Sequence, residues 1–267
     1  MINARGTAMK IVKYQQRGKD SWGISQGGIV FSLEGDLYGE FRKGKQICSL
    51  EEVRLLAPVE PTIMVCCGMN YTERFKEDYS SNLGLKPTAE PVIFFKPPSA
   101  VVGPSDDVVF LSIAETLRYE AELCVVIKRR ARNVPEREAG NYILGYTCGN
   151  ELGAMDLMKR DRWMTRAKGF DTSACLGPWV ETDLQAGNLF IRSWVNGEKK
   201  QDSNTRFMIF SVEKLISFIS QFMTLRPGDI IFTGSPAGAC NVNVGDVMEI
   251  EIEGVGTLKN KVVRAEK

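Results

Sequence analysis

Short apolar runs separated by glycine place the strongest constraint on the fold of this chain. In residues 9–56 the runs KIVKY, SWGIS, GIVFSL and DLYGEF each have strand length, and the glycines between them supply turns. Further strands are predicted in RYEAELCVVI and YILGYTCGN, and a hairpin in VMEIEIEGVGTLKNKVV. A helix is predicted in NVPEREAGNY, and a helix or turn in LGAMDLMKRDRW. Ser211 is predicted to cap a further helix whose apolar residues Val212, Leu215, Ile216, Ile219 and Phe222 follow the helical period. Strands outnumber helices and do not alternate regularly with them, so the pattern predicts a mixed α+β architecture.

The pattern also divides the chain into two parts. Residues 1–57 are predicted to form a small β-rich lobe, and residues 58–267 the main body, with the Pro-punctuated LLAPVEP at 55–61 as the linker. A lobe of this size buries too little apolar surface to be stable alone, so we expect it to pack on the remainder.

Histidine is absent from all 267 residues, which excludes Ser-His-Asp, Cys-His and zinc-His mechanisms. The formal net charge of +1 gives no reason to expect nucleic acid or an anionic membrane as a partner. No apolar signal-peptide core or membrane-length apolar run occurs. Seven cysteines, an odd number without C-x-x-C spacing, suit reduced, buried thiols. We therefore expect a cytoplasmic protein.

Two glutamates share one face of a predicted strand. Glu120 and Glu122 are two residues apart, about 6.6 Å along a strand, and their face continues with the apolar Cys124 and Val126. Buried unpaired carboxylates are unstable, and a divalent cation with oxygen ligands such as Mg²⁺ or Mn²⁺ would compensate them. Glu151, at the end of a neighbouring apolar strand, is the candidate third ligand.

The same sequence holds a control for that interpretation. Glu249, Glu251 and Glu253 have the same spacing but alternate with apolar residues throughout. Such strict alternation is typical of a half-exposed strand, so these glutamates are predicted to face solvent. A solvated face is the alternative for the first pair as well.

Two further segments are candidates for substrate contact. Lys168 in TRAKGFDT is either solvated or a positive charge that stabilises an oxyanion or enolate opposite a metal. The loop TGSPAG, with Thr233, Gly234 and Ser235, offers backbone N–H groups that suit a carboxylate or carbonyl oxygen. It lacks the pattern of a phosphate-binding P-loop.

Several motifs in one order resemble the fumarylacetoacetate hydrolase family. They are GMNYTERFKE, PVIFFKPPSAVVGP, ETLRYEAELCVVI, TRAKGFDTSACLGPWV, VNGEKKQDSNT, MIFSVEKLISFISQFMTLRPGDIIFTGSPAG and GDVMEIEIEGVGTL. The resemblance implies a mixed β-roll or β-sandwich fold with a small N-terminal lobe, and a homodimer. It implies Mg²⁺ or Mn²⁺ on Glu120, Glu122 and Glu151, with Lys168 facing a β-dicarbonyl or 2-oxo acid substrate whose enolate the metal stabilises.

The departures from the family pattern fall in the segments expected to contact substrate. In NY-x-x-H-x-x-E, which begins here with Asn70 and Tyr71, Arg74 replaces the histidine that activates water with Glu77. Arginine stays protonated and cannot be a general base. Met155 and Met158 stand where the family has a substrate-gripping Arg and a Gln, which predicts a less polar substrate.

Three functions remain open from the sequence. The first is a C–C lyase, decarboxylase or isomerase that relies on the metal and Lys168, with Arg74 on a substrate carboxylate or enolate. The second is a hydrolase of the fumarylacetoacetate or acylpyruvate type with Glu77 or Glu73 as base. The third is a catalytically inactive binding homologue. Residues 69–90 are a candidate lid over the site.

Overall fold

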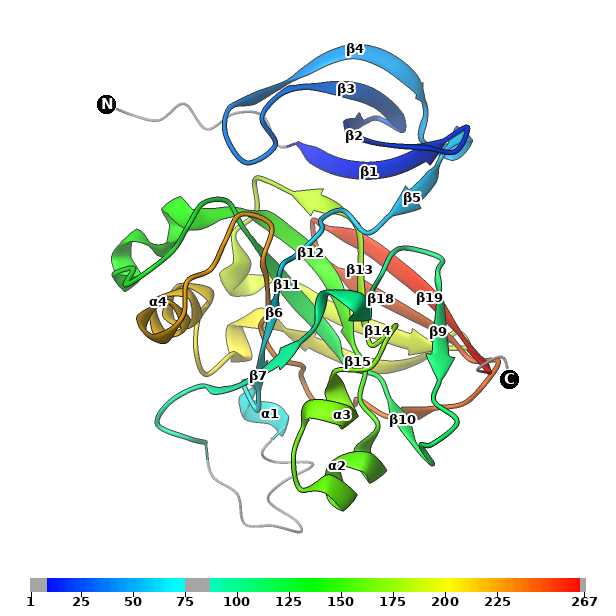
Figure 1. Cartoon of the computed structure of the whole chain (residues 1–267), viewed down its shortest axis with the longest axis vertical. Coiled ribbons are helices and arrows are strands. Elements are labelled where there is room, and N and C mark those ends of the chain that lie inside the picture. The colour runs from blue at the N-terminus through cyan, green and yellow to red at the C-terminus, as the bar shows by residue number, and fades with distance from the viewer. Residues whose placement is uncertain (1–8, 75–86, 265–267) are drawn as a thin grey trace.

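The computed structural model describes residues 9–74 and 87–264. One large sheet runs through both parts of the chain, and the first four strands are stacked at one end of the molecule (Figure 1). The order along this sheet is β4-β3-β2-β1-β13-β12-β11-β16-β6-β7, while β5 pairs with β1 and β8 with β13. The strands are β1 Lys10–Gln16, β2 Lys19–Gln26, β3 Ile29–Gly35, β4 Phe41–Ser49, β5 Arg54–Leu56, β6 Met64–Gly68, β7 Val92–Lys96, β8 Val101–Val102, β11 Ala121–Ile127, β12 Ile143–Glu151, β13 Ala174–Glu181 and β16 Ile230–Phe232.

A second, five-stranded sheet packs against the central strands of the first. Its order is β15-β14-β18-β19-β9, and the short β10 and β17 pair separately. These strands are β9 Asp107–Phe110, β10 Leu117–Arg118, β14 Phe190–Val195, β15 Glu198–Asn204, β17 Asn241–Val242, β18 Val247–Ile252 and β19 Gly256–Arg264. The two-sheet arrangement with few helices confirms the predicted mixed β-rich α+β fold.

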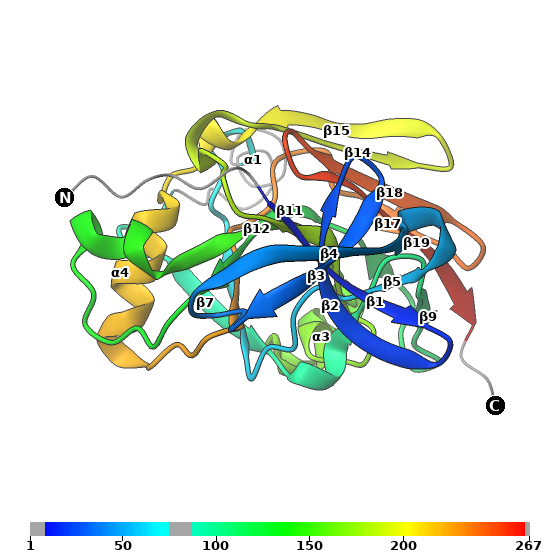
Figure 2. The same cartoon turned by 90° about the horizontal axis from the view of Figure 1, so that it is seen from above.

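The N-terminal strands join the body through a short stretch of backbone pairing. Strand β1 is antiparallel to β13, with Lys10 opposite Glu181 and Ile11 opposite Val180. Seen from above, β1–β4 lie across the central strands (Figure 2). The lobe therefore packs on the remainder, as its small size predicts.

The helices lie outside the sheets, and none of those described is long and apolar enough to cross a bilayer. Ser211 accepts a hydrogen bond from the Lys214 N–H and caps α4, as predicted. Of its apolar residues, Phe222 is exposed and the others are buried: Val212, Leu215, Ile216 and Ile219. The α-helices are α1 Thr72–Arg74, α2 Met155–Asp161, α3 Thr165–Lys168 and α4 Val212–Phe222.

Strand β11 is buried along its whole length, which explains why it carries no alternation between core and water. Leu123 and Val125 belong to the main core between the two sheets, whereas Cys124 and Val126 belong to a second core on the opposite face. The two strands beside it, β12 and β16, cover its edges. Any carboxylate carried by this strand thus enters a dry environment.

Three local predictions need correction. Residues 36–40 of DLYGEF form a turn, in which the Gly39 N–H donates to the Asp36 carbonyl at 3.0 Å, and β4 begins only at Phe41. The helix predicted in NVPEREAGNY is a 3₁₀ helix, Glu136–Tyr142. The run RYEAELCVVI is divided between β10 and β11. Lys168 is the last residue of the short helix α3.

Candidate functional site

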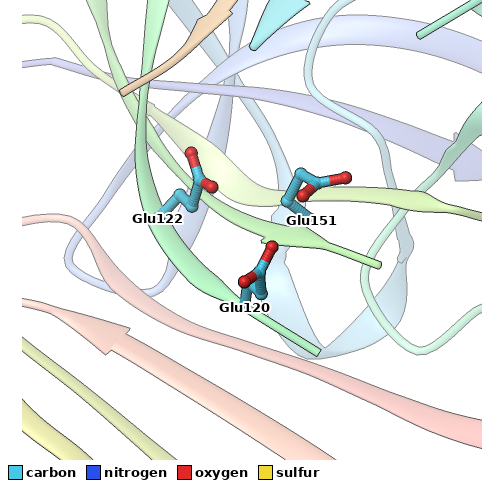
Figure 3. A group of neighbouring side chains, drawn as sticks. All are labelled: Glu120, Glu122 and Glu151. Carbon is cyan, nitrogen blue, oxygen red and sulfur yellow. The ribbon is translucent and has the colours of Figure 1, made fainter. Parts of the chain in front are cut away.

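Three glutamates converge where β11 and β12 lie side by side (Figure 3). Glu120 directly precedes β11, Glu122 is its second residue and Glu151 is the last residue of β12. The Glu151 N–H donates to the Glu120 carbonyl at 2.9 Å, which fixes the register. One carboxylate oxygen from each residue lies within 4.8 Å of the others. The residues are 6%, 3% and 1% exposed, so the candidate ligand set of the sequence is assembled and buried.

Two buried lysines contact these carboxylates. Lys168 Nζ lies 2.7 Å from Glu120 Oε2 and also donates to Glu151 Oε2. Lys96 Nζ lies 2.7 Å from Glu151 Oε1 and donates to the Leu152 carbonyl at 2.9 Å. A Cβ on Gly153 would lie 2.8 Å from Lys168 Nζ, so glycine at this position leaves room for the lysine. Lys168 is thus not solvated.

Arg74 supplies a third positive charge. Its Nη2 donates to Glu120 Oε1, and the ion pair is almost fully buried. Asn70 holds this part of the chain, because its Nδ2 donates to the Thr233 carbonyl at 2.7 Å and its Oδ1 accepts from the Phe210 N–H at 2.7 Å. Arg74, which the resemblance aligns with the histidine of the family motif, therefore lies at the carboxylates.

The three carboxylates differ in their electrostatic surroundings. Burial alone would raise the pKa of Glu120, but Arg74 and Lys168 lower it well below its ordinary value. Burial, with Glu151 and Glu120 nearby, raises the pKa of Glu122 well above its ordinary value. Burial raises the pKa of Glu151 against the opposing effect of Lys168. Burial would lower the pKa of Lys168, yet the contacts with Glu120 and Glu151 raise it, so the ammonium stays charged.

The glycine-rich loop after β16 uses its hydrogen-bonding groups inside the protein. The Gly234 N–H donates to Glu122 Oε2 at 2.7 Å, and Thr233 Oγ1 donates to the Leu123 carbonyl at 2.8 Å. Gly234 has φ +98°, and a Cβ there would lie 2.7 Å from Asn70 Cβ, so glycine is required. The loop thus orients a carboxylate of the protein, whereas the sequence predicts that it holds a substrate oxygen.

A cavity of about 270 Å³ opens at the carboxylates. Its lining combines ionic and apolar side chains. Ser235 is the residue of the 233–235 loop that lines it. The lining includes Arg74, Glu120, Glu122, Glu151, Lys168 and Ser235, together with Cys67, Val92, Phe94, Met155, Met158 and Met164.

Other sequence-based candidates lie elsewhere. Tyr71 is fully buried and is not among the described lining residues. Glu73 is also absent from the lining, and its Oε2 accepts from Ser203 Oγ. Glu77 and much of the candidate lid lie outside the described residues. All seven cysteines are free thiols and six are buried, as expected.

Sequence reasoning missed Lys96. It is 0% exposed and contacts Glu151, so it belongs to the same ionic cluster. Its signal was a lone lysine at the end of the apolar run PVIFF, a position where a charge needs a buried partner. That partner comes from a strand about fifty residues further on and could not be identified from spacing.

The carboxylates fit a hard divalent cation. Oxygen ligands of one six-coordinate Mg²⁺ or Mn²⁺ ion lie roughly 3–4 Å apart, so small side-chain shifts would bring the three oxygens onto it. Among the described residues, no salt bridge to a cationic side chain is formed by Glu122, whereas Glu120 and Glu151 both have such partners. A cation bound here would compensate the negative charge of Glu122, which has no salt bridge to a cationic side chain among the described residues.

A buried cavity lined by ionisable groups with shifted pKa values is the arrangement of an enzyme for small molecules. Residues 63–263 match the family described as fumarylacetoacetate (FAA) hydrolase C-terminal, and residues 9–58 match the Rv2993c-like N-terminal region. The chain belongs to the fumarylacetoacetate hydrolase family.

Curated relatives share much of the chain. Protein Rv2993c of Mycobacterium tuberculosis is 43% identical over 82% of this chain and 82% of its own length. The 4-hydroxyphenylacetate degradation bifunctional isomerase/decarboxylase of Salmonella dublin is 40% identical over 73% of this chain and 46% of its own. Oxaloacetate tautomerase fahd2 of Xenopus laevis is 36% identical over 82% and 71%.

Solved structures agree with the fold. The 2-hydroxyhepta-2,4-diene-1,7-dioate isomerase of Mycobacterium marinum superimposes with a TM-score of 0.88 at 37% identity, covering 97% of this chain and 100% of that one. The maleylpyruvate hydrolase of Sphingobium sp. SYK-6, solved with manganese(II) and pyruvate, has a TM-score of 0.79 at 25% identity over 97% and 100%.

Proposed function

We propose that this protein is a divalent-metal-dependent enzyme that tautomerises or decarboxylates a 2-oxo acid or β-dicarbonyl compound. The observation that carries the proposal is the convergence of Glu120, Glu122 and Glu151 within 4.8 Å, beside Lys168, at a cavity that also has several apolar lining residues. A divalent cation held by these carboxylates would bind the two substrate oxygens and stabilise the negative charge of an enolate.

Lys168 would supply a fixed positive charge to the substrate. Its ammonium lines the cavity and is held by two carboxylates, so it stays protonated and needs no reorganisation when charge develops on a substrate oxygen. The apolar lining residues, which include Met155 and Met158, would exclude water from the reacting carbons. A fixed positive charge and the exclusion of water both favour a reaction that passes through an enolate of the substrate.

Hydrolysis would require a base that activates water. Arg74 cannot accept a proton, and it pairs with Glu120 instead. Glu73 Oε2 accepts a hydrogen bond from Ser203 Oγ, and Glu73 is not among the described lining residues of the cavity. Among the described lining residues, every carboxylate belongs to the candidate ligand set. Neither proposed reaction consumes water. Tautomerisation moves one proton between a carbon and an oxygen of the substrate, and decarboxylation releases CO₂ and leaves an enolate that takes up a proton. Relatives whose names denote an isomerase/decarboxylase and a tautomerase support this choice.

The test is to supply oxaloacetate and an acylpyruvate to the purified protein with Mn²⁺ or Mg²⁺. We expect metal-dependent enol–keto conversion or decarboxylation of oxaloacetate, and little hydrolysis of the acylpyruvate. Lys168→Met should lower that activity at least about 100-fold, since one preorganised charge contributes roughly this much. Lys259→Met, which changes an exposed lysine of the second sheet, is the matched control.

The other outcomes discriminate between the alternatives. Rapid hydrolysis of the acylpyruvate would support a hydrolase, with Glu77 as the remaining candidate base. Hydrolysis gained only in Arg74→His would show that a base alone is missing. If no 2-oxo acid is turned over and the metal does not raise the melting temperature, the inactive binding homologue is favoured. The homodimer that the family resemblance implies remains a prediction for sedimentation analysis.

A further inference from the structure

A second hollow adjoins the candidate active site. It lies between β7, the edge strand of the large sheet, and the junction of α2 with α3, and its volume is about 770 Å³. Phe94, Met158 and Met164 line both this hollow and the site cavity. These three side chains therefore form a wall that the two hollows share.

The second hollow has the surface of an apolar binding site. Trp163 is 77% exposed, the highest value among the large exposed hydrophobic side chains of the described residues, and Phe95 is 45% exposed. Both line this hollow, together with Ile93 and the two methionines of the shared wall. Exposed aromatic residues gathered in one concave surface indicate a ligand or partner, because monomeric proteins rarely leave such an apolar patch in contact with water.

Most of the charged side chains line the site cavity rather than the second hollow. The carboxylates, Lys168 and Arg74 line the smaller cavity, and among the described lining residues of the hollow Arg162 is the one that carries a charge. A molecule that spans both spaces would have a compact polar head and an apolar tail. Methionine side chains at the shared wall are flexible enough to admit a tail of irregular shape.

We propose that the hollow of Phe95 and Trp163 is the subsite for an aryl or alkyl tail of the substrate. This inference rests on the proposed function, because it places the 2-oxo acid head at the carboxylates. It assigns the substrate class as a 2-oxo acid or β-dicarbonyl compound with an apolar substituent. The tail would pass Phe94, Met158 and Met164 and stack on Trp163.

The test compares oxamate with N-phenyloxamate. Neither compound has the second carboxylate that the proposed decarboxylation would remove, so both serve as unreactive probes. Oxamate presents two adjacent oxygens as a 2-oxo acid does, and the phenyl group adds only the tail. With saturating Mn²⁺, we expect N-phenyloxamate to bind at least about tenfold more tightly in titration calorimetry, as partial burial of one ring provides.

Trp163→Ala should abolish that gain and leave the affinity for oxamate unchanged. Because Trp163 is exposed, this variant should fold with an unchanged melting temperature. Phe190→Ala removes another exposed aromatic side chain, from β14 of the second sheet, and should keep the gain.

Two results would overturn the subsite while the proposed function stands: equal affinities for the two probes, or a gain that survives Trp163→Ala. A third would be dissociation of an oligomer by Trp163→Ala in sedimentation, which would make the hollow a contact between copies of the chain. If neither probe binds with Mn²⁺, the proposed function fails, and the subsite with it.

Discussion

Glutamates occur at alternate positions at the start of β11 and along β18, and the surroundings of the two pairs are opposite. At β11, Glu120 and Glu122 are 6% and 3% exposed, and both faces of the strand are buried. In β18, Glu249 and Glu251 are half-buried on the outer face, while Met248, Ile250 and Ile252 fill the core. The same spacing thus gives a candidate metal site in one strand and a solvent-facing row in the other.

The difference comes from the neighbours of each strand. β11 lies between β12 and β16 in the large sheet, and cores cover both of its faces. β18 has only one covered face, and Glu249 pairs with Lys259 of β19 at 3.1 Å near the surface. Carboxylates of β11 must be compensated by buried cations, whereas water compensates those of β18. The comparison predicts different responses to matched substitutions.

The largest expected effect is on stability at the buried cluster. Lys96→Met removes one of the two cations beside Glu151, with side chains 0% and 1% exposed, and also the hydrogen bonds to Leu152 and Ser173. Glu151 keeps Lys168 but loses one partner of a buried ion pair, which costs about 3 kcal/mol. Urea denaturation without added metal measures this loss. A loss under 1 kcal/mol would show that Glu151 does not need this lysine.

The next effect concerns metal binding. Glu122→Gln keeps the shape of the side chain and removes one negative oxygen ligand, so we expect Mn²⁺ affinity to fall about 100-fold, or roughly 2.7 kcal/mol. Glu251→Gln makes the same change in β18 and should leave Mn²⁺ affinity unchanged. Titration calorimetry measures both variants. Equal affinities of Glu122→Gln and the native protein would remove Glu122 from the ligand set.

Arg74 provides a smaller effect of the opposite sign. Its guanidinium pairs with Glu120 Oε1, so it competes with a cation for that carboxylate. Arg74→Gln should therefore raise Mn²⁺ affinity about tenfold, which corresponds to about 1.4 kcal/mol. Arg192→Gln, at an exposed pair with Asp202, is the control and should have no effect. Weaker Mn²⁺ binding in Arg74→Gln would instead mean that Arg74 holds Glu120 in position for the metal.

Local pattern predicted much of this molecule, and long-range packing decided the rest. The cap at Ser211 and the outward row of β18 follow from neighbouring residues alone. The sequence indicated that Glu120 and Glu122 share a face, but their burial depends on strands distant in the chain.

The partners of the buried carboxylates are the clearest case. Lys96 and Glu151 are 55 positions apart, and only the sheet order brings β7 and β12 to the same cavity. The Gly234 N–H likewise reaches Glu122 from 112 residues away. The sequence indicates that the loop at 233–235 offers backbone N–H donors, but it does not identify their acceptors. For this reason the sequence predicts a substrate oxygen as the acceptor, whereas the Gly234 N–H donates to Glu122.

The smallest expected effect returns to β18. Lys259→Met removes the partner of Glu249 at a pair whose side chains are 59% and 33% exposed. Water solvates the remaining carboxylate, so the free energy of unfolding should fall by less than about 1 kcal/mol, and 1 M NaCl should remove most of the difference by screening. Urea denaturation at low and high salt measures both quantities. A loss that equals that of Lys96→Met would mean that the two strands do not differ in the way their burial indicates, and that sheet order does not determine the compensation of their glutamates.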